Sequence, residues 1–241
     1  MAVIAVYELL PRYSGRHWGV SRPFLWAWAA TTVMVLIVYP HHLMMDYAMP
    51  QWMLVMGQII SYTSGLPVFV VTVYGALTNI YRCGIRWSMP AMLLVLSMFG
   101  WAAGIVPAII DGTISVNEIM HNTQWVPGHF HFYLLLGVLP MVLALMFHLI
   151  GGRAPRRASG GKLSFAVYVI GGMVFVCAFL AAGHVSVPRR FAAHVPQWMP
   201  YDRAGSIGAI LVIAAMLLFS MRIVAGLLRA PDSADPTHAA D

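Results

Sequence analysis

The sequence contains few charged residues. Of its 241 residues, 9% are Asp, Glu, Lys or Arg, whereas 60% are hydrophobic. Ordinary soluble domains carry about 25% charged and about 45–50% apolar residues. The mean hydropathy is correspondingly high, at +0.77. This composition excludes a disordered chain, a coiled coil and an ordinary soluble enzyme, and it indicates a polytopic membrane protein.

Cysteine is also scarce, and the two cysteines, Cys83 and Cys177, lie far apart in the chain. This excludes a disulfide scaffold and a cysteine-based metal site. The formal net charge of +6 would suit a nucleic-acid partner. The basic residues, however, lie between apolar blocks, as membrane topology requires, so we expect no nucleic-acid partner.

Long charge-free segments dominate the rest of the chain. A transmembrane helix needs roughly 20 apolar residues. Six windows have that length or nearly so: 23–45, 52–77, 89–110, 125–150, 163–185, and 204–221 extending toward 228. Their residues are continuously apolar rather than alternating, which disfavours strands. We therefore predict an all-α, polytopic membrane helical bundle with six transmembrane helices.

The first ten residues are apolar apart from Glu8, and we expect Pro11 and Arg12 to end that segment. Ten residues are too few to cross a bilayer. No basic region precedes them and no cleavage site follows, so they do not form a signal peptide. Two interpretations remain: the end of a preceding helix whose beginning is not in this chain, or a short interfacial segment.

The distribution of Lys and Arg predicts the orientation. Eleven basic residues fall in one set of loops: Arg12, Arg16, Arg22, Arg82, Arg86, Arg153, Arg156, Arg157, Lys162, Arg222 and Arg229. The opposite set contains Arg189, Arg190 and Arg203. The positive-inside rule then places both termini in the cytoplasm. We expect one membrane domain over residues 1–229 and a disordered cytoplasmic tail over residues 230–241.

Ten histidines stand out in so apolar a chain. Ionisable residues within a membrane are costly and are functional candidates. In the predicted topology His148 lies near the inner end of its helix. Seven others fall toward the outer half of the bilayer or just beyond it: His41, His42, His121, His129, His131, His184 and His194. This clustering at one depth, from four segments, predicts a shared site.

His129 and His131 are two residues apart in one predicted helix. Positions two apart on a helix differ by about 200°, so the two imidazoles point to opposite sides. They could therefore serve two metal centres that flank the helix, such as two haems. Gly128 leaves room for a bulky planar group to approach the backbone. The alternative is a pair of hydrogen-bonded interhelical histidines.

Pro40, His41 and His42 form a second candidate metal site. Neighbouring imidazoles reach one metal only from a distorted turn, which Pro40 would supply. Ligation by imidazole alone suits copper, zinc or iron, and a third ligand must come from elsewhere.

Residues 187–190, VPRR, place two adjacent arginines in the outer loops, which otherwise contain few basic residues. Arginine is suited to bidentate binding of carboxylates, so Arg189 and Arg190 need an anionic partner. Haem propionates or Asp202 would serve, and the alternative is an exposed basic loop.

Residues 121–131, HNTQWVPGHFH, resemble the haem-ligand helix of subunit I of the haem–copper oxidases, in the form of the B-type branch with its cytochrome ba-type oxidases. The HH pair and VPRR occur in the same order as in that family. The resemblance runs from Tyr7 to about Leu228 and covers the carboxyl-terminal half of that subunit.

The resemblance implies two haems and one copper ion. His129 would be the axial ligand of the high-spin haem, where oxygen binds, and His131 an axial ligand of the low-spin haem. His41 and His42 would be two of three copper ligands. The reaction would be that of a cytochrome c oxidase, the reduction of dioxygen to water coupled to proton translocation.

On the outer side the resemblance implies that Arg189 and Arg190 hold haem propionates, with His121 near them. Asn117 stands where relatives place an acid, and Glu118 would substitute for it. The implied setting is a bacterial-type inner membrane. The implied partners are the lipid bilayer, a copper-bearing subunit II, and cytochrome c as the electron donor.

The family also needs a further haem histidine, a third copper histidine and a cross-linked tyrosine, which lie earlier in its chains and are absent here. The expected further partner is thus the remaining half of subunit I, unless the sequence is a truncation. Two alternatives stay open. One is a nitric oxide reductase, which uses non-haem iron with a nearby glutamate, and the other is a non-catalytic haem-binding fragment.

Overall fold

The computed structural model describes residues 2–17, 21–38, 44–45, 48–151 and 159–228. Its regular elements in these ranges are helices, and the one extended contact there is an isolated bridge between Thr123 and Pro188. The predicted all-helical class is therefore confirmed. His41, His42 and the predicted tail over residues 230–241 lie outside the described residues.

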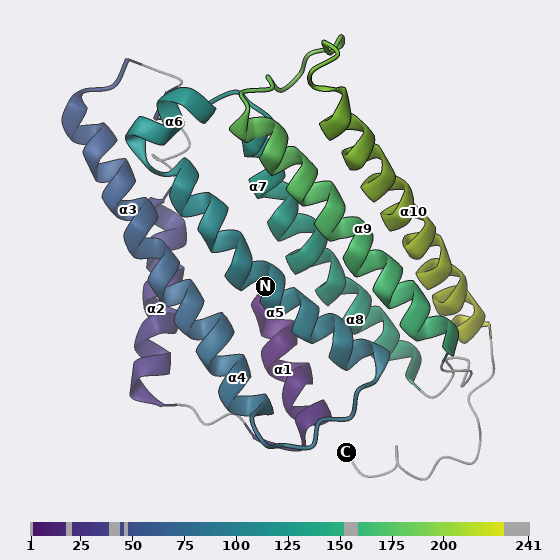
Figure 1. Ribbon diagram of the computed structural model, residues 1–241. Helices are drawn as coiled ribbons and strands as arrows, with labels where there is room; N and C mark the ends of the chain where they lie inside the picture. The colour runs from purple at the N-terminus through teal and green to yellow at the C-terminus, as the bar shows by residue number, and fades with distance from the viewer. Residues whose placement is uncertain (1, 18–20, 39–43, 46–47, 152–158, 229–241) are drawn as a thin grey trace, which may run out of the picture.

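Within the described residues, four helical rods are long and apolar enough to cross a membrane. They are α5 (Met89–Asp111), the rod formed by α7 (Trp125–Tyr133), η3 (Leu134–Val138) and α8 (Leu139–Ile150), then α9 (Ser159–His184) and α10 (Met199–Leu227). The rods lie side by side, as Figure 1 shows. They support a membrane-embedded helical bundle.

The two remaining predicted windows fall on α2 (Arg22–Ile37) and on α3 (Gln51–Phe69). The latter continues through the π-helix Val70–Tyr74 into α4 (Gly75–Ile80). Both stand at the other side of the bundle from α10 (Figure 1). The full count of six transmembrane helices remains a prediction.

Two helix starts follow directly from the sequence. The Ser21 hydroxyl accepts a hydrogen bond from the Phe24 N–H, and the Ser88 hydroxyl accepts one from the Ala91 N–H. Each serine precedes a proline in the first turn of its helix. Such N-caps satisfy backbone donors that have no partner within the helix.

The first helix ends later than the sequence predicts. Helix α1 (Ala2–Ser14) continues past Pro11 instead of ending there. Tertiary contacts stabilise the extra turn, because the Ser14 hydroxyl donates to Asn79 Oδ1 at 2.6 Å and the Tyr13 hydroxyl bonds His148 Nδ1 at 2.8 Å. A proline within a helix removes one backbone hydrogen bond, and these side-chain bonds offset that loss.

Glycines allow the central helices to approach closely. A Cβ atom added at Gly100 of α5 would lie 2.1 Å from the Leu136 carbonyl carbon, and one at Gly208 of α10 would lie 2.5 Å from the Phe175 amide nitrogen. Small residues at such contacts are how membrane helices gain packing area.

The π-helix η3 frees backbone carbonyls inside the bundle. The Ser97 hydroxyl donates to the Gly137 carbonyl at 2.7 Å, and the Tyr168 hydroxyl donates to the Leu135 carbonyl. Because carbonyl groups in a membrane interior must be satisfied internally, these two side chains stabilise the irregular turn next to the candidate site.

Candidate functional site

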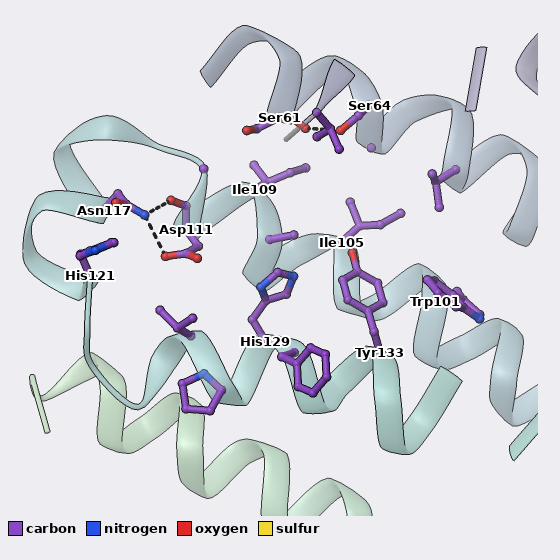
Figure 2. Close-up of a pocket in the computed structure, with 18 of the residues that line it drawn as sticks. Ser61, Ser64, Trp101, Ile105, Ile109, Asp111, Asn117, His121, His129 and Tyr133 are labelled. Atoms are coloured by element: carbon purple, nitrogen blue, oxygen red, sulfur yellow. Dashed lines mark hydrogen bonds between the residues drawn. The ribbon is translucent and has the colours of Figure 1, made fainter. Parts of the chain in front are cut away.

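A cavity of about 930 Å³ opens toward the end of the bundle that carries α6 (Ile114–Met120). Its volume falls near the top of the range, about 300–1,000 Å³, that is typical of small-molecule and cofactor sites. Its walls come from α2, α3, α5, α6, α7, α9 and the connection after α9. Figure 2 shows the polar groups that meet in it, which are Ser61, Ser64, Asp111, Asn117, His121, His129 and Tyr133.

His129 projects from α7 into this cavity (Figure 2). Its ring lies edge-to-face with Tyr133, at 5.2 Å between centroids, and Tyr133 lies 5.2 Å from the Trp101 ring. Tyr133 can lie close to α5 because residue 104 is glycine, where a Cβ atom would be 2.7 Å from the Tyr133 ring. Packing therefore fixes the direction of the imidazole.

His131 lies on a different side of α7. Its ring packs against Phe175 and Phe179 of α9, at 5.3 and 5.8 Å between centroids. Its Nδ1 atom lies 2.6 Å from the Pro127 carbonyl oxygen, so Nδ1 carries the proton and donates it. The lone pair is then on Nε2, which is the arrangement usual for a metal-ligating histidine.

One wall of the cavity includes two segments that lie far apart in the sequence. The Gln124 N–H donates to the Val187 carbonyl at 2.8 Å, and the Arg189 N–H donates to the Asn122 carbonyl at 2.8 Å. The Arg189 guanidinium also bonds Asn122 Oδ1 through Nε at 3.0 Å and Nη2 at 2.6 Å. This backbone pairing brings the VPRR segment against the residues that precede α7.

Arg189, Arg190 and His121 consequently all line the cavity that contains His129. Asp202, one of the two anionic partners considered for the arginines, instead pairs with His194 at 2.6 Å. Two arginines therefore line a cavity large enough for a cofactor, and propionate carboxylates match guanidinium groups chemically.

Asp111 is a cavity residue that the sequence did not single out. It is the last residue of α5, and it receives two hydrogen bonds from Asn117 Nδ2, at 2.7 Å to its carbonyl oxygen and 3.1 Å to Oδ1. Glu118, expected to supply an acid here, is exposed and does not line the cavity. An aspartate that closes a long apolar run resembles an ordinary helix boundary, so only the tertiary structure shows its position.

The structure thus brings together four of the predicted site residues, His121, His129, Arg189 and Arg190, and places His131 apart from them. The predicted copper ligands His41 and His42 lie outside the described residues. Among the described residues, no three His, Cys, Asp or Glu side chains gather in a group that could hold a metal ion. The roles of all these residues as ligands remain predictions.

A comparison with protein-family models and a comparison with solved structures both match this chain to the same kind of protein. Residues 1–211 match the model of the family described as cytochrome c and quinol oxidase polypeptide I. A solved heme–copper terminal oxidase dimer has the same fold over 95% of this chain, with a TM-score of 0.79 and 19% sequence identity.

Two curated relatives extend the similarity along the whole chain. Cytochrome c oxidase subunit 1 of Thermus thermophilus is 26% identical over 97% of this chain, and cytochrome c oxidase polypeptide 1 of Halobacterium salinarum is 24% identical over 95%. The chain spans 46% and 39% of the length of these two relatives.

Proposed function

Because the chain belongs to the family of cytochrome c and quinol oxidase polypeptide I, we propose that it is the carboxyl-terminal half of the catalytic subunit of a respiratory terminal oxidase. Such an enzyme would reduce dioxygen to water with electrons from cytochrome c, coupled to proton translocation. The observation that carries the proposal is the placement of His129 in a cavity that Arg189 and Arg190 also line, with His131 on another side of the same helix.

The residues present fit two haems. His129 would hold the iron of the high-spin haem from within the cavity, while Arg189 and Arg190 would bind its propionates. His131 would bind the low-spin haem through Nε2, with its ring oriented by the hydrogen bond to Pro127. His41 and His42 would bind copper. The bound metals supply the electron transfer and the oxygen chemistry, while the chain holds and orients them.

The proposed enzyme needs ligands and an electron donor that lie outside this sequence. The ligands that this sequence lacks would come from the remaining half of subunit I, and electrons would arrive from cytochrome c through a copper-bearing subunit II. Six transmembrane helices in a bacterial-type cytoplasmic membrane, with both termini cytoplasmic, fit the charge asymmetry of the loops.

The two glutamates of the chain bear on the alternative reaction, nitric oxide reduction. Glu8 is exposed and pairs with Arg12 at 2.7 Å, and Glu118 is exposed on α6. Neither lines the cavity, so this half offers no glutamate there to a non-haem iron. Oxygen reduction is therefore the function that we propose.

The test is to purify the complex from native membranes and to measure three properties: intact masses, haem spectra and oxygen consumption with reduced cytochrome c. We expect two haem signals and cytochrome c-dependent oxygen uptake. The missing histidines should lie either in a second chain beside a 26.5 kDa polypeptide or in one heavier polypeptide that contains this sequence. A 26.5 kDa polypeptide without such a companion and without haem would instead identify a non-catalytic fragment.

A further inference from the structure

Three rings, those of His129, Tyr133 and Trp101, form an aromatic row along one wall of the cavity (Figure 2). The His129 imidazole meets the Tyr133 ring edge-to-face, with 5.2 Å between centroids and 72° between planes. The Tyr133 ring lies in turn against the Trp101 indole, at 5.2 Å and 35°. Neither Tyr133 nor Trp101 is a ligand in the proposed function, although both line the cavity beside the candidate iron ligand.

The face of α5 that carries Trp101 otherwise consists of small residues. Ser97, Gly100 and Gly104 lie three or four positions from Trp101 or from each other, so they share its side of the helix. A Cβ atom at Gly100 would lie 2.1 Å from the Leu136 carbonyl carbon, so the backbones of α5 and η3 are in contact. This close approach leaves the large indole little room to move.

Backbone atoms confine both outer members of the aromatic row. A Cβ atom at Gly137 of η3 would lie 3.3 Å from the Trp101 Nε1 atom, so this glycine makes room for the edge of the indole. The Gly137 carbonyl is itself fixed by the hydrogen bond from Ser97 at 2.7 Å. A Cβ atom at Gly104 would lie 2.7 Å from the Tyr133 ring. Tyr133 therefore cannot move away from the imidazole without displacing α5 or the indole.

This confinement restricts the rotation of the His129 ring. Aromatic rings prefer defined edge-to-face geometries, so a fixed Tyr133 ring favours one rotation of the imidazole against it. Groups that orient a metal-ligating histidine also tune the metal, because the ring direction sets the overlap of the nitrogen lone pair with the iron. His129 and Tyr133 are four positions apart on one rod, so the helix itself brings the two rings together.

We propose that Tyr133, backed by Trp101, is the positioning residue that sets the rotation of the His129 imidazole and thereby the strength of its bond to haem iron. The ring of Tyr133 makes the contact, so its hydroxyl group is dispensable for this role. The inference rests on the proposed function, because it requires that His129 holds a haem.

The experiment records the iron–histidine stretching band of the reduced high-spin haem, by resonance Raman spectroscopy of the purified complex. Tyr133→Leu removes the ring, and we expect the band to broaden and to shift to lower frequency, because the imidazole then samples more rotations. Tyr133→Phe keeps the ring and should retain the wild-type band. Phe132→Leu is the matched control, since this neighbouring ring is buried and contacts Phe99 of α5, and it should leave the band unchanged.

Trp101→Leu tests whether the two aromatic residues act in series. Without the indole Tyr133 can move, so the band should shift in the same direction as in Tyr133→Leu, by a smaller amount. The double variant should shift the band no further than Tyr133→Leu alone, because Trp101 acts through Tyr133. Additive shifts would contradict this arrangement.

A wild-type band in Tyr133→Leu would overturn the inference while leaving the proposed function intact. An equally large shift in Tyr133→Phe would overturn it too, because the hydroxyl group would then carry the effect. If Tyr133→Leu does not assemble, Trp101→Leu decides, and an unchanged band in that variant would reject the inference. A wild-type complex without any iron–histidine band would contradict the proposed function itself.

Discussion

At the scale of single residues, the spacing of two histidines organises the site. His129 and His131 leave α7 in different directions, one into the cavity and the other against Phe175 and Phe179. Helical geometry alone requires this divergence for positions two apart. Helical geometry does not determine the tautomer of His131. The hydrogen bond that Nδ1 donates to the Pro127 carbonyl selects the tautomer with a lone pair on Nε2.

Because the two imidazoles point in different directions, we predict that mutating each histidine affects a different haem. His131→Ala should remove the reduced absorption bands of the low-spin haem and leave carbon monoxide binding in place. His129→Ala should abolish carbon monoxide binding, because it removes the ligand of the oxygen-reactive iron. Absorption spectra of the reduced complex, with and without carbon monoxide, measure both effects.

His148 provides the control, because it lies in the last turn of α8 and bonds Tyr13 rather than facing the cavity. His148→Gln should leave both spectra unchanged. Low-spin bands that survive His131→Ala would contradict the assignment of His131 to the low-spin haem. Carbon monoxide binding that survives His129→Ala would contradict the assignment of His129 to the oxygen-reactive haem.

At the scale of elements, the contact between α7 and α9 determines the shape of the site. A Cβ atom at Gly183 would lie 2.1 Å from the Trp125 backbone nitrogen, so the end of α9 touches the start of α7. That contact lets Gln124 and Arg189 form the backbone bonds that align the two motifs. A glycine in a helix interior is costly relative to alanine, and here close packing is the reason for it.

Gly183→Ala should therefore reduce assembly and haem content sharply. Overpacking costs about 1–3 kcal/mol, and the clash here is with backbone, which cannot rotate away. Gly205→Ala is the matched control, since its Cβ atom would meet Phe179 at an ordinary 3.6 Å. We expect this control to be neutral or slightly stabilising, because alanine favours a helix by about 1 kcal/mol over glycine. Thermal stability and haem per protein measure both, and equal values for the two variants would contradict the packing argument.

At the scale of the whole molecule, the two ends of the bundle differ in chemistry. The end formed by α1, α4 and the start of α5 carries arginines, and the Arg16 guanidinium donates to the Tyr81 and Arg82 carbonyls at 2.6 and 2.8 Å. The opposite end carries α6 and the VPRR segment, and Figure 1 shows the helices running between these two ends. The site therefore lies toward the side that we predict to be outside.

A thiol-labelling experiment tests this orientation. In a Cys177→Ser background, a membrane-impermeant maleimide applied to intact cells should modify Ala192→Cys, which is exposed in the connection between α9 and α10. It should not modify Cys83, which lies in the connection between α4 and α5. Permeabilised cells should permit labelling of both, and labelling of Cys83 alone in intact cells would reverse the predicted topology.

Most of the architecture follows from the sequence by simple physics. The scarcity of charge and the length of the apolar windows determine a helical membrane bundle, because unpaired backbone groups are not tolerated in lipid. The windows at 89–110 and 125–150 match α5 and the α7–α8 rod closely. The same reasoning failed at Pro11, where bonds from Ser14 and Tyr13 to distant residues extend α1 by a turn.

The candidate site, like the fold, could be predicted from the sequence only in part. Residue types and spacing were enough to identify the candidate site residues and to predict that His129 and His131 diverge, because helical periodicity depends only on local geometry. The folded chain was needed to show that Arg189 and Arg190 line the same cavity as His129, and that Asp111 rather than Glu118 is the acid there. Those placements depend on the glycine-mediated contact of α7 with α9 and on the hydrogen bond from the first residue of α6 to Gln58 of α3, which join segments that no local pattern connects.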